Sequence, residues 1–136
     1  MTTVPSDTGT PDFRRIAVVL DGAADQLDHY GWFQGSNWDG EQADRGAPRS
    51  EARQCAMGAI TTAVCGDPSA ETLPDATAFA LWNAAIDAVE DHTRGIGAGN
   101  LTAWNDAEGR THAEVTSVLR TAARAVREGG PTGDPC

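Results

Sequence analysis

Four segments of the chain carry apolar residues at intervals of three and four, and each of them opens on a residue that caps helices. Side chains with this spacing share one face of an α-helix, whereas a strand would alternate apolar and polar residues. The segments are residues 10–31, 50–66, 72–95 and 111–129. We therefore predict an all-α fold with four main helices, formed by a single domain that spans residues 11–128.

The first two helices have clear boundary signals. Thr10 is the expected N-cap of the first helix, with a proline at the first helical position, and Gly31 is its expected end. Ser50 is the expected cap of the second helix, and Gly66 stands where a left-handed C-terminal glycine belongs. Gly58 falls within the second helix, where it costs about 1 kcal/mol relative to alanine but lets another backbone approach closely.

The third and fourth helices also open on capping sequences. Thr72 is the expected cap of the third helix. The residues predicted on the inner face of that helix are Phe79, Trp82, Ile86 and Val89. The fourth helix begins with a Thr-His-Ala-Glu capping box at residues 111–114. Between these two helices, residues 101–106 are predicted to form one short helical turn.

Residues 32–49 have no helical period and contain three glycines and a proline. They are predicted to form a long ordered loop, or a short hairpin, between the first two helices. The loop carries Trp32 and Trp38, whose rings must pack on the core or on a ligand. Residues 1–10 and 129–136 are polar and are predicted to be a disordered arm and a disordered tail.

The chain has a net charge of −10 and contains no lysine. Phosphate backbones and anionic membranes repel such a protein, so we expect no nucleic-acid or membrane partner. A protein partner or a small cationic ligand fits this charge better. No segment is long and apolar enough to span a bilayer, and the N-terminus lacks a signal-peptide pattern, so a soluble cytoplasmic protein is expected. The three cysteines are expected to be free thiols.

Three short motifs resemble those of a known family. They are GW-x-QG at residues 31–35, CA-x-GA at residues 55–59 and WND at residues 104–106. In this order they are similar to motifs of small actinobacterial and actinophage proteins that form a domain family of unknown function. The resemblance covers roughly residues 13–127. It implies a domain boundary and no established activity.

Cys55 is the candidate nucleophile. A cysteine near a helix N-terminus can have a lowered pKa and react as a thiolate. His112, together with Asp106 or Asn105, would complete a catalytic triad with it. The alternative is that Cys55 fills space in the apolar face of the second helix, about a turn and a half from its start, and that His112 is solvated.

The WND triplet combines an aromatic ring, an amide and a carboxylate. These groups can stack on and hydrogen-bond a flat polar or cationic ligand. The candidate ligand-binding residues are Trp32, Gln34, Trp38, Trp104 and Asn105. The alternative is that Trp104 fills the core while the two polar residues form a turn before the last helix. In both cases we expect the GW-x-QG loop to pack against the WND triplet.

No metal site and no cofactor are predicted. The chain has no CxxC or HxxxH spacing, and the faintly calcium-like run at residues 37–40 lacks the key acids. The glycine-rich run at residues 95–99 resembles a phosphate loop only in composition.

Three classes of function are compatible with this sequence. The first is a small acidic, non-catalytic binding or regulatory domain. The second is a small cysteine-dependent enzyme, a hydrolase or transferase, that uses Cys55. The third is an interaction protein whose acidic surface is the interface. Thiol reactivity separates the second class from the other two, because a thiolate nucleophile reacts at neutral pH and a core thiol reacts only on unfolding.

Overall fold

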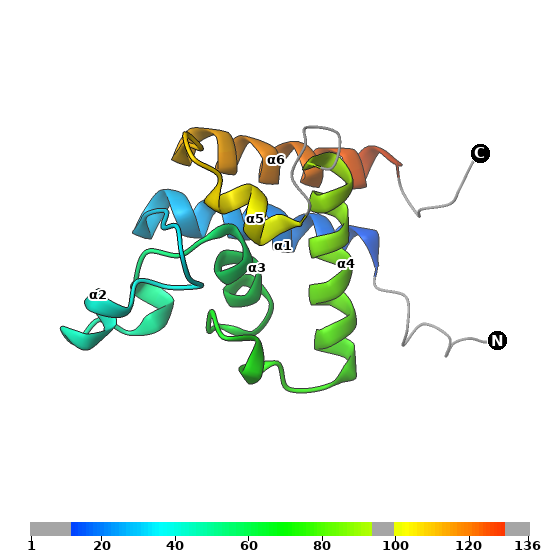
Figure 1. Ribbon diagram of the computed structural model, residues 1–136. Helices are drawn as coiled ribbons and strands as arrows, with labels where there is room; N and C mark the ends of the chain where they lie inside the picture. Colours follow the sequence, from blue (N-terminus) through cyan, green and yellow to red (C-terminus); the bar gives the residue numbers. More distant parts are fainter. Residues whose placement is uncertain (1–11, 94–99, 130–136) are drawn as a thin grey trace.

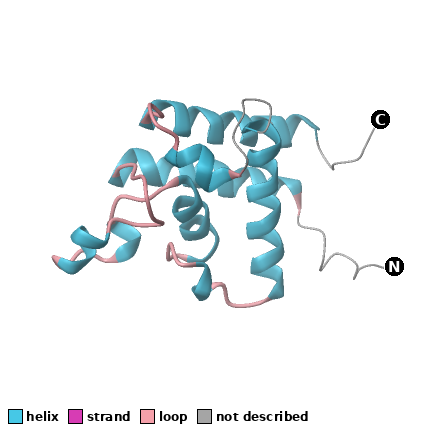
Figure 2. Ribbon diagram, in the orientation of Figure 1, coloured by secondary structure: helices cyan, strands magenta, loops and turns pink. Residues whose placement is uncertain are grey.

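The computed structural model describes residues 12–93 and 100–129. These residues form six α-helices and two 3-10 turns, and Figure 2 shows no strand among them. The helices are α1 (Phe13–Tyr30), α2 (Gly40–Asp44), α3 (Ala56–Cys65), α4 (Ala76–Thr93), α5 (Leu101–Asp106) and α6 (His112–Gly129). The 3-10 turns are η2 (Arg49–Glu51) and η3 (Ala70–Thr72).

The all-α prediction is confirmed for the described part of the chain, with two helices more than the four main ones predicted. The predicted short turn at residues 101–106 is α5, and α2 lies inside the predicted loop. Two isolated bridges join Gln54 to Trp32 and to Trp38, so this region is not a simple hairpin. The predicted arm, the glycine-rich run at residues 95–99 and all of the predicted tail except Gly129 lie outside the described residues.

The helices α1 and α6 lie side by side and antiparallel (Figure 1). Ion pairs join their exposed edges: Arg120 lies 2.9 Å from Asp25 and 3.0 Å from Asp28, and Arg127 lies 2.7 Å from Asp21. Exposed pairs of this kind contribute at most about 1 kcal/mol each. The helices α3 and α4 pack against α1, and α4 also contacts α6.

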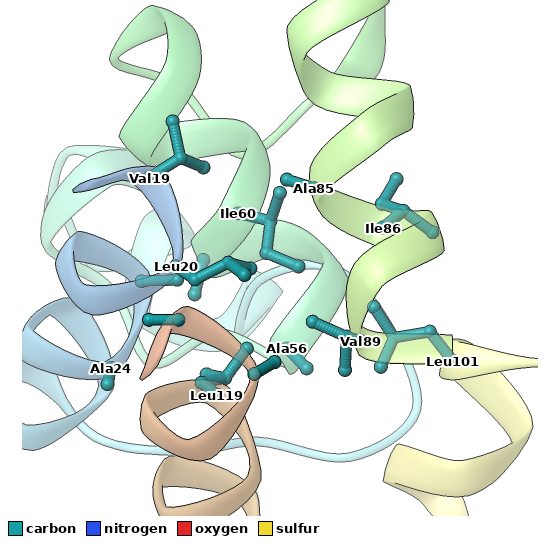
Figure 3. Close-up of a cluster of buried hydrophobic side chains, with 14 of the residues drawn as sticks. Val19, Leu20, Ala24, Ala56, Ile60, Ala85, Ile86, Val89, Leu101 and Leu119 are labelled. Carbon is teal, nitrogen blue, oxygen red and sulfur yellow. The ribbon is translucent and has the colours of Figure 1, made fainter. Parts of the chain in front are cut away.

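The core lies where these four long helices and α5 meet. Leu20 of α1, Ile60 of α3, Val89 of α4 and Leu119 of α6 converge there, close to Leu101 at the start of α5 (Figure 3). All five side chains are aliphatic and fully buried. Alanines fill much of the space between them, and such small side chains let helices pack closely.

Aspartates, not the predicted threonines, cap α1 and α4. The Asp12 carboxylate accepts a hydrogen bond from a backbone N–H in the first turn of α1, and Asp75 does the same for α4. Thr72, the predicted cap of the third helix, lies in η3, and Thr10 lies outside the described residues. Both aspartates stand immediately before the first helical residue, where a short acceptor reaches the free N–H groups best.

The start of α3 is also later than predicted. Ser50 lies in η2, and residues 52–54 lie outside any helix. There the backbone of Gln54 forms bridges to Trp32 and Trp38 in the loop at residues 31–39, which we call the tryptophan loop. Cys55 is therefore the N-cap of α3, and its sulfur accepts a hydrogen bond from the backbone N–H of Gly58 at 3.4 Å. The prediction that Cys55 lies a turn and a half inside the helix is wrong.

Other boundary signals are confirmed. The Thr111 hydroxyl accepts from the backbone N–H of Glu114, whose carboxylate accepts from the backbone N–H of Thr111, as a capping box requires. Gly31 and Gly66 end α1 and α3 with φ values of 108° and 88°, which favour glycine.

The buried face of α4 differs from the prediction in its first turn. Ile86 and Val89 are buried as predicted and Trp82 is half-buried, but Phe79 is 53% exposed. The first turns of α4, which include Phe79, extend beyond α1 and α6 in Figure 1. Leu81 is buried instead.

Candidate functional site

The GW-x-QG loop and the WND triplet are in direct contact, as predicted. The indole N–H of Trp32 donates to the side-chain oxygen of Asn105 at 2.7 Å. The Gln34 amide donates to the backbone oxygens of Asn105 and Ala107 at 3.0 and 3.1 Å. The backbone N–H of Gly35 donates to the Asp106 carboxylate at 3.0 Å. We call this set of hydrogen bonds the clasp.

Asn105 is the centre of the clasp, and it is fully buried. Its side-chain oxygen accepts a second hydrogen bond from the backbone N–H of Ala56, at 3.0 Å. Its side-chain nitrogen donates to the backbone oxygen of Phe33 at 3.2 Å and to the Asp106 carboxylate at 2.9 Å. One amide thus joins α5, the start of α3 and the tryptophan loop.

Backbone hydrogen bonds from Gln54, just before α3, also hold the tryptophan loop in place. The backbone of Gln54 accepts from the N–H of Phe33 at 2.9 Å and donates to the oxygen of Gly31 at 3.1 Å. The Gln54 side chain is fully buried and is bonded to the oxygen of Arg49 and the hydroxyl of Thr62. A buried polar side chain with both of its ends paired stabilises this geometry.

Gly58 permits a close backbone contact between α3 and the loop. A Cβ atom at Gly58 would lie 2.1 Å from the backbone oxygen of Asn37, so only glycine fits without a shift of the backbone. The Asn37 side chain is held by the backbone oxygen of Pro68 at 3.0 Å. The close approach expected from this glycine in the sequence is confirmed.

Asp39 and Arg53 form a further link that the sequence analysis missed. Asp39 is buried, caps α2 and accepts from the guanidinium of Arg53, whose Nε lies 3.0 Å from the carboxylate. This hydrogen bond holds the pKa of Asp39 below its ordinary value. The signal in the sequence is an aspartate directly before Gly40 and Glu41, a pattern typical of a helix start.

The thiol of Cys55 is buried, with 3% of the residue exposed. Burial raises the pKa of this thiol, since a thiolate would lose its hydration, although the N–H of Gly58 acts in the opposite direction. The Asn37 side-chain oxygen lies 3.8 Å from the sulfur. A thiol in this environment is protonated at neutral pH and is a weak nucleophile.

The described contacts do not bring Cys55, His112 and Asp106 together as a triad. The imidazole of His112 lies 3.2 Å from the carboxylate of Asp28 on α1. Asp106 accepts hydrogen bonds from Gly35 and Asn105, as described above. Cys55 contacts neither residue by a hydrogen bond within the described ranges.

The five candidate ligand-binding residues separate into three groups. Trp32, Gln34 and Asn105 belong to the clasp. Trp104 is buried in the core, with the guanidinium of Arg110 lying 4.2 Å from its ring centroid. Trp38 is half-buried, and the guanidinium of Arg49 lies 4.8 Å from its ring centroid.

Within residues 12–93 and 100–129, no group of three or more histidine, cysteine or acidic side chains is arranged to hold a metal ion. In the same ranges, no helix has the length and apolar character needed to cross a membrane. Cys55 and Cys65 are free thiols as predicted, and Cys136 lies outside the described residues.

These features define a small all-helical domain in which an internal polar clasp fastens a tryptophan-bearing loop. Residues 13–125 match a family of unknown function, DUF6197, and the chain belongs to that family. Comparison with curated proteins gave no match, and comparison with solved structures gave none either.

Proposed function

We propose that this protein is a non-catalytic binding or regulatory domain, and that it acts on a basic protein partner. The observation that carries the proposal is the environment of Cys55. This residue is the best candidate nucleophile in the sequence, yet its thiol is buried and caps α3. A catalytic thiol needs an accessible site, a nearby base and a lowered pKa.

The internal hydrogen bonds of the clasp support the same proposal. Its amide and carboxylate groups bond to the protein's own backbone and side chains, so a ligand would have to break existing hydrogen bonds to reach them. Each broken bond that leaves a buried donor unpaired costs about 1–3 kcal/mol. Recognition on the outer surface avoids this cost.

The charge of the chain supports a basic partner. A protein with a net charge of −10 attracts cationic surfaces and repels anionic ones over several ångströms beyond contact. The free thiols fit a reducing compartment, and we place the protein in the cytoplasm for this reason.

Alkylation of the native protein tests the non-catalytic proposal. Iodoacetamide is added at neutral pH, and peptide mapping follows the modification of Cys55, with half-buried Cys65 as the internal reference. We expect Cys55 to react only after the protein is unfolded in guanidinium chloride. The Cys55→Ser variant should keep its helical circular dichroism spectrum, because serine is a good N-cap. Rapid modification of Cys55 in the native state would favour the cysteine-dependent enzyme.

A further inference from the structure

Charge is distributed unevenly along the chain. Between Arg53 and Arg94 there is no arginine or lysine. The same stretch contains six acids, which are Asp67, Glu71, Asp75, Asp87, Glu90 and Asp91. By contrast, the acids of α1 at positions 21, 25 and 28 are paired with arginines of α6. The part of the molecule built from α3 and α4 is therefore its most acidic part.

Several of the six acids already have partners, among them Asp75, whose carboxylate accepts from the backbone N–H of Ala78 as the cap of α4. Asp67 is paired with Arg49, and Glu90 accepts from the backbone N–H of Leu101 at 2.9 Å. Asp87 lies on α4 and Asp75 immediately precedes the helix, and both residues are exposed. These two carboxylates contribute directly to the negative potential on the outer side of that helix.

An aromatic ring is exposed between these two acids. Phe79 is 53% exposed, and its ring centroid lies 5.5 Å from that of Trp82. The indole N–H of Trp82 donates to the hydroxyl of Thr61 on α3 at 2.9 Å, and that hydroxyl is anchored to the oxygen of Met57. Phe79 therefore rests against a ring that is held in place.

Phe79, Asn83 and Asp87 follow the capping residue Asp75 at intervals of four along α4, and all four residues are exposed. Residues four apart on a helix are neighbours on its surface. They form one stripe, which we call the α4 stripe. It begins at the end of α4 that extends beyond α1 and α6 in Figure 1.

Other aromatic rings of this protein illustrate a cation that can stack on an exposed ring such as that of Phe79. The guanidinium groups of Arg14, Arg49, Arg53 and Arg110 lie over the rings of Phe13, Trp38, Phe33 and Trp104, at 4.2–5.4 Å from the centroids. Phe79 has no such cation over it within the described residues, and no arginine is near it in sequence. An exposed ring flanked by carboxylates is complementary to a guanidinium group.

We propose that the α4 stripe is the docking surface for an arginine-bearing segment of a basic partner protein. This inference rests on the proposed function, and it adds where the partner docks and which chemical groups recognise it. One guanidinium group stacks on Phe79, and neighbouring basic side chains pair with Asp75 and Asp87. Apolar atoms of the segment cover the remaining exposed part of the ring.

The test is an NMR titration of the full-length, ¹⁵N-labelled protein with a blocked synthetic peptide of arginine and leucine residues. The same peptide with glutamate in place of each arginine is the control ligand. The Phe79→Ala variant is compared with Val18→Ala, which also removes an exposed apolar side chain, 64% exposed on α1. Melting curves of both variants establish that they are folded.

We expect saturable shifts of the amides of α4 with the arginine peptide and none with the glutamate peptide. Phe79→Ala should weaken binding about fivefold and Asp87→Asn about twofold, since exposed cation–π and ionic contacts are worth up to about 1 kcal/mol each. Val18→Ala should bind like the wild type. Added salt should weaken binding in every variant.

Three results would overturn the inference. If saturable shifts map away from α4, or if Phe79→Ala and Val18→Ala bind equally, the α4 stripe is not the docking surface, although a basic partner remains supported. If the arginine peptide gives no saturable shifts at millimolar concentration, the stripe does not bind basic segments. The alkylation experiment decides separately whether the domain is non-catalytic.

Discussion

Asn105 uses its full hydrogen-bonding capacity inside the protein. An asparagine side chain has two N–H donors and an oxygen with two lone pairs, and all four positions are occupied in the clasp. The side chain holds three backbone segments together and has no group left for a ligand. The hydrogen-bonding groups of Asn105 therefore serve to stabilise the fold.

Removing the Asn105 side chain should destabilise the fold more than removing that of its neighbour. In Asn105→Ala the N–H groups of Trp32 and Ala56 lose their acceptor, and we expect a loss of about 2–4 kcal/mol in the free energy of unfolding. In Asp106→Ala the N–H of Gly35 and one N–H of Asn105 lose their acceptor, but the lost carboxylate is exposed and water can replace it at Gly35, so we expect a smaller loss of about 1–2 kcal/mol. Urea denaturation measures both variants.

Equal losses in the two variants would show that the clasp acts through Asp106. No loss in Asn105→Ala would show that the clasp does not stabilise the fold. A stabilising effect of Asp106→Ala would point instead to a site kept for a ligand, since functional residues often reduce stability.

The sequence predicted part of this site. Contact between the two motifs followed from two tryptophans placed outside the four predicted main helices, because large rings need to be covered from water. The role of Cys55 as a cap and the pairing of Asp39 with Arg53 did not follow. The capping role and the ion pair both depend on where residues 52–54 dock. Contacts with the tryptophan loop set that docking, and no local sequence pattern predicts it.

At the scale of elements, the contact of α3 with the tryptophan loop depends on Gly58. Alanine is the better helix former, and glycine within a helix normally reduces stability by about 0.5–1 kcal/mol relative to alanine. Here the missing Cβ lets the oxygen of Asn37 approach the helix directly. The stabilisation from this close contact outweighs the lower helix propensity of glycine.

Gly58→Ala should therefore destabilise the protein, by about 1–3 kcal/mol in the free energy of unfolding, because the backbone at Asn37 has to move. Gly22→Ala is the matched control within α1. A Cβ at Gly22 would lie 3.6 Å from the Cβ of Ala63, an ordinary contact, so this variant should be stabilised by about 0.5–1 kcal/mol. Thermal melting compares them. Stabilisation by both substitutions would mean that the loop moves away from α3 without loss.

The four main helices were predicted correctly as elements, although the starts of three of them were misplaced. The capping box of α6, the terminal glycines and the four long apolar faces depend on residues within a turn or two of each other. Phe79 was assigned to the inner face because its spacing to Trp82 and Ile86 is helical. Its exposure depends on how the helices pack against one another, and the spacing within one helix does not predict that packing.

At the scale of the whole molecule, the ion pair of Asp39 makes stability depend on pH. The pKa of Asp39 is lower in the folded protein than the model-peptide value of about 3.9. Ionised Asp39 therefore stabilises the fold above that value, and the contribution disappears as the pH falls through the folded pKa. Asp39→Asn keeps a capping side chain but removes this dependence.

Melting temperatures measured from about pH 7 down to about pH 3 test this expectation. The Asp39→Asn variant should be less stable than the wild type at neutral pH, and the two curves should converge at acidic pH. The exposed Asp44→Asn variant of the same short helix is the control and should follow the wild type. Parallel curves for wild type and Asp39→Asn would contradict a role for the ionised carboxylate.

The clasp also has a consequence for biosynthesis. The hydrogen bonds of Asn105 reach back 49, 72 and 73 positions along the chain, to Ala56, Phe33 and Trp32. Contacts of such long sequence separation close late, because the loop entropy is lost before the contact is gained. On the ribosome, the tryptophan segment therefore stays without its acceptor until α5 has left the exit tunnel. The nascent domain should acquire its native loop in one late step, after α5 has emerged.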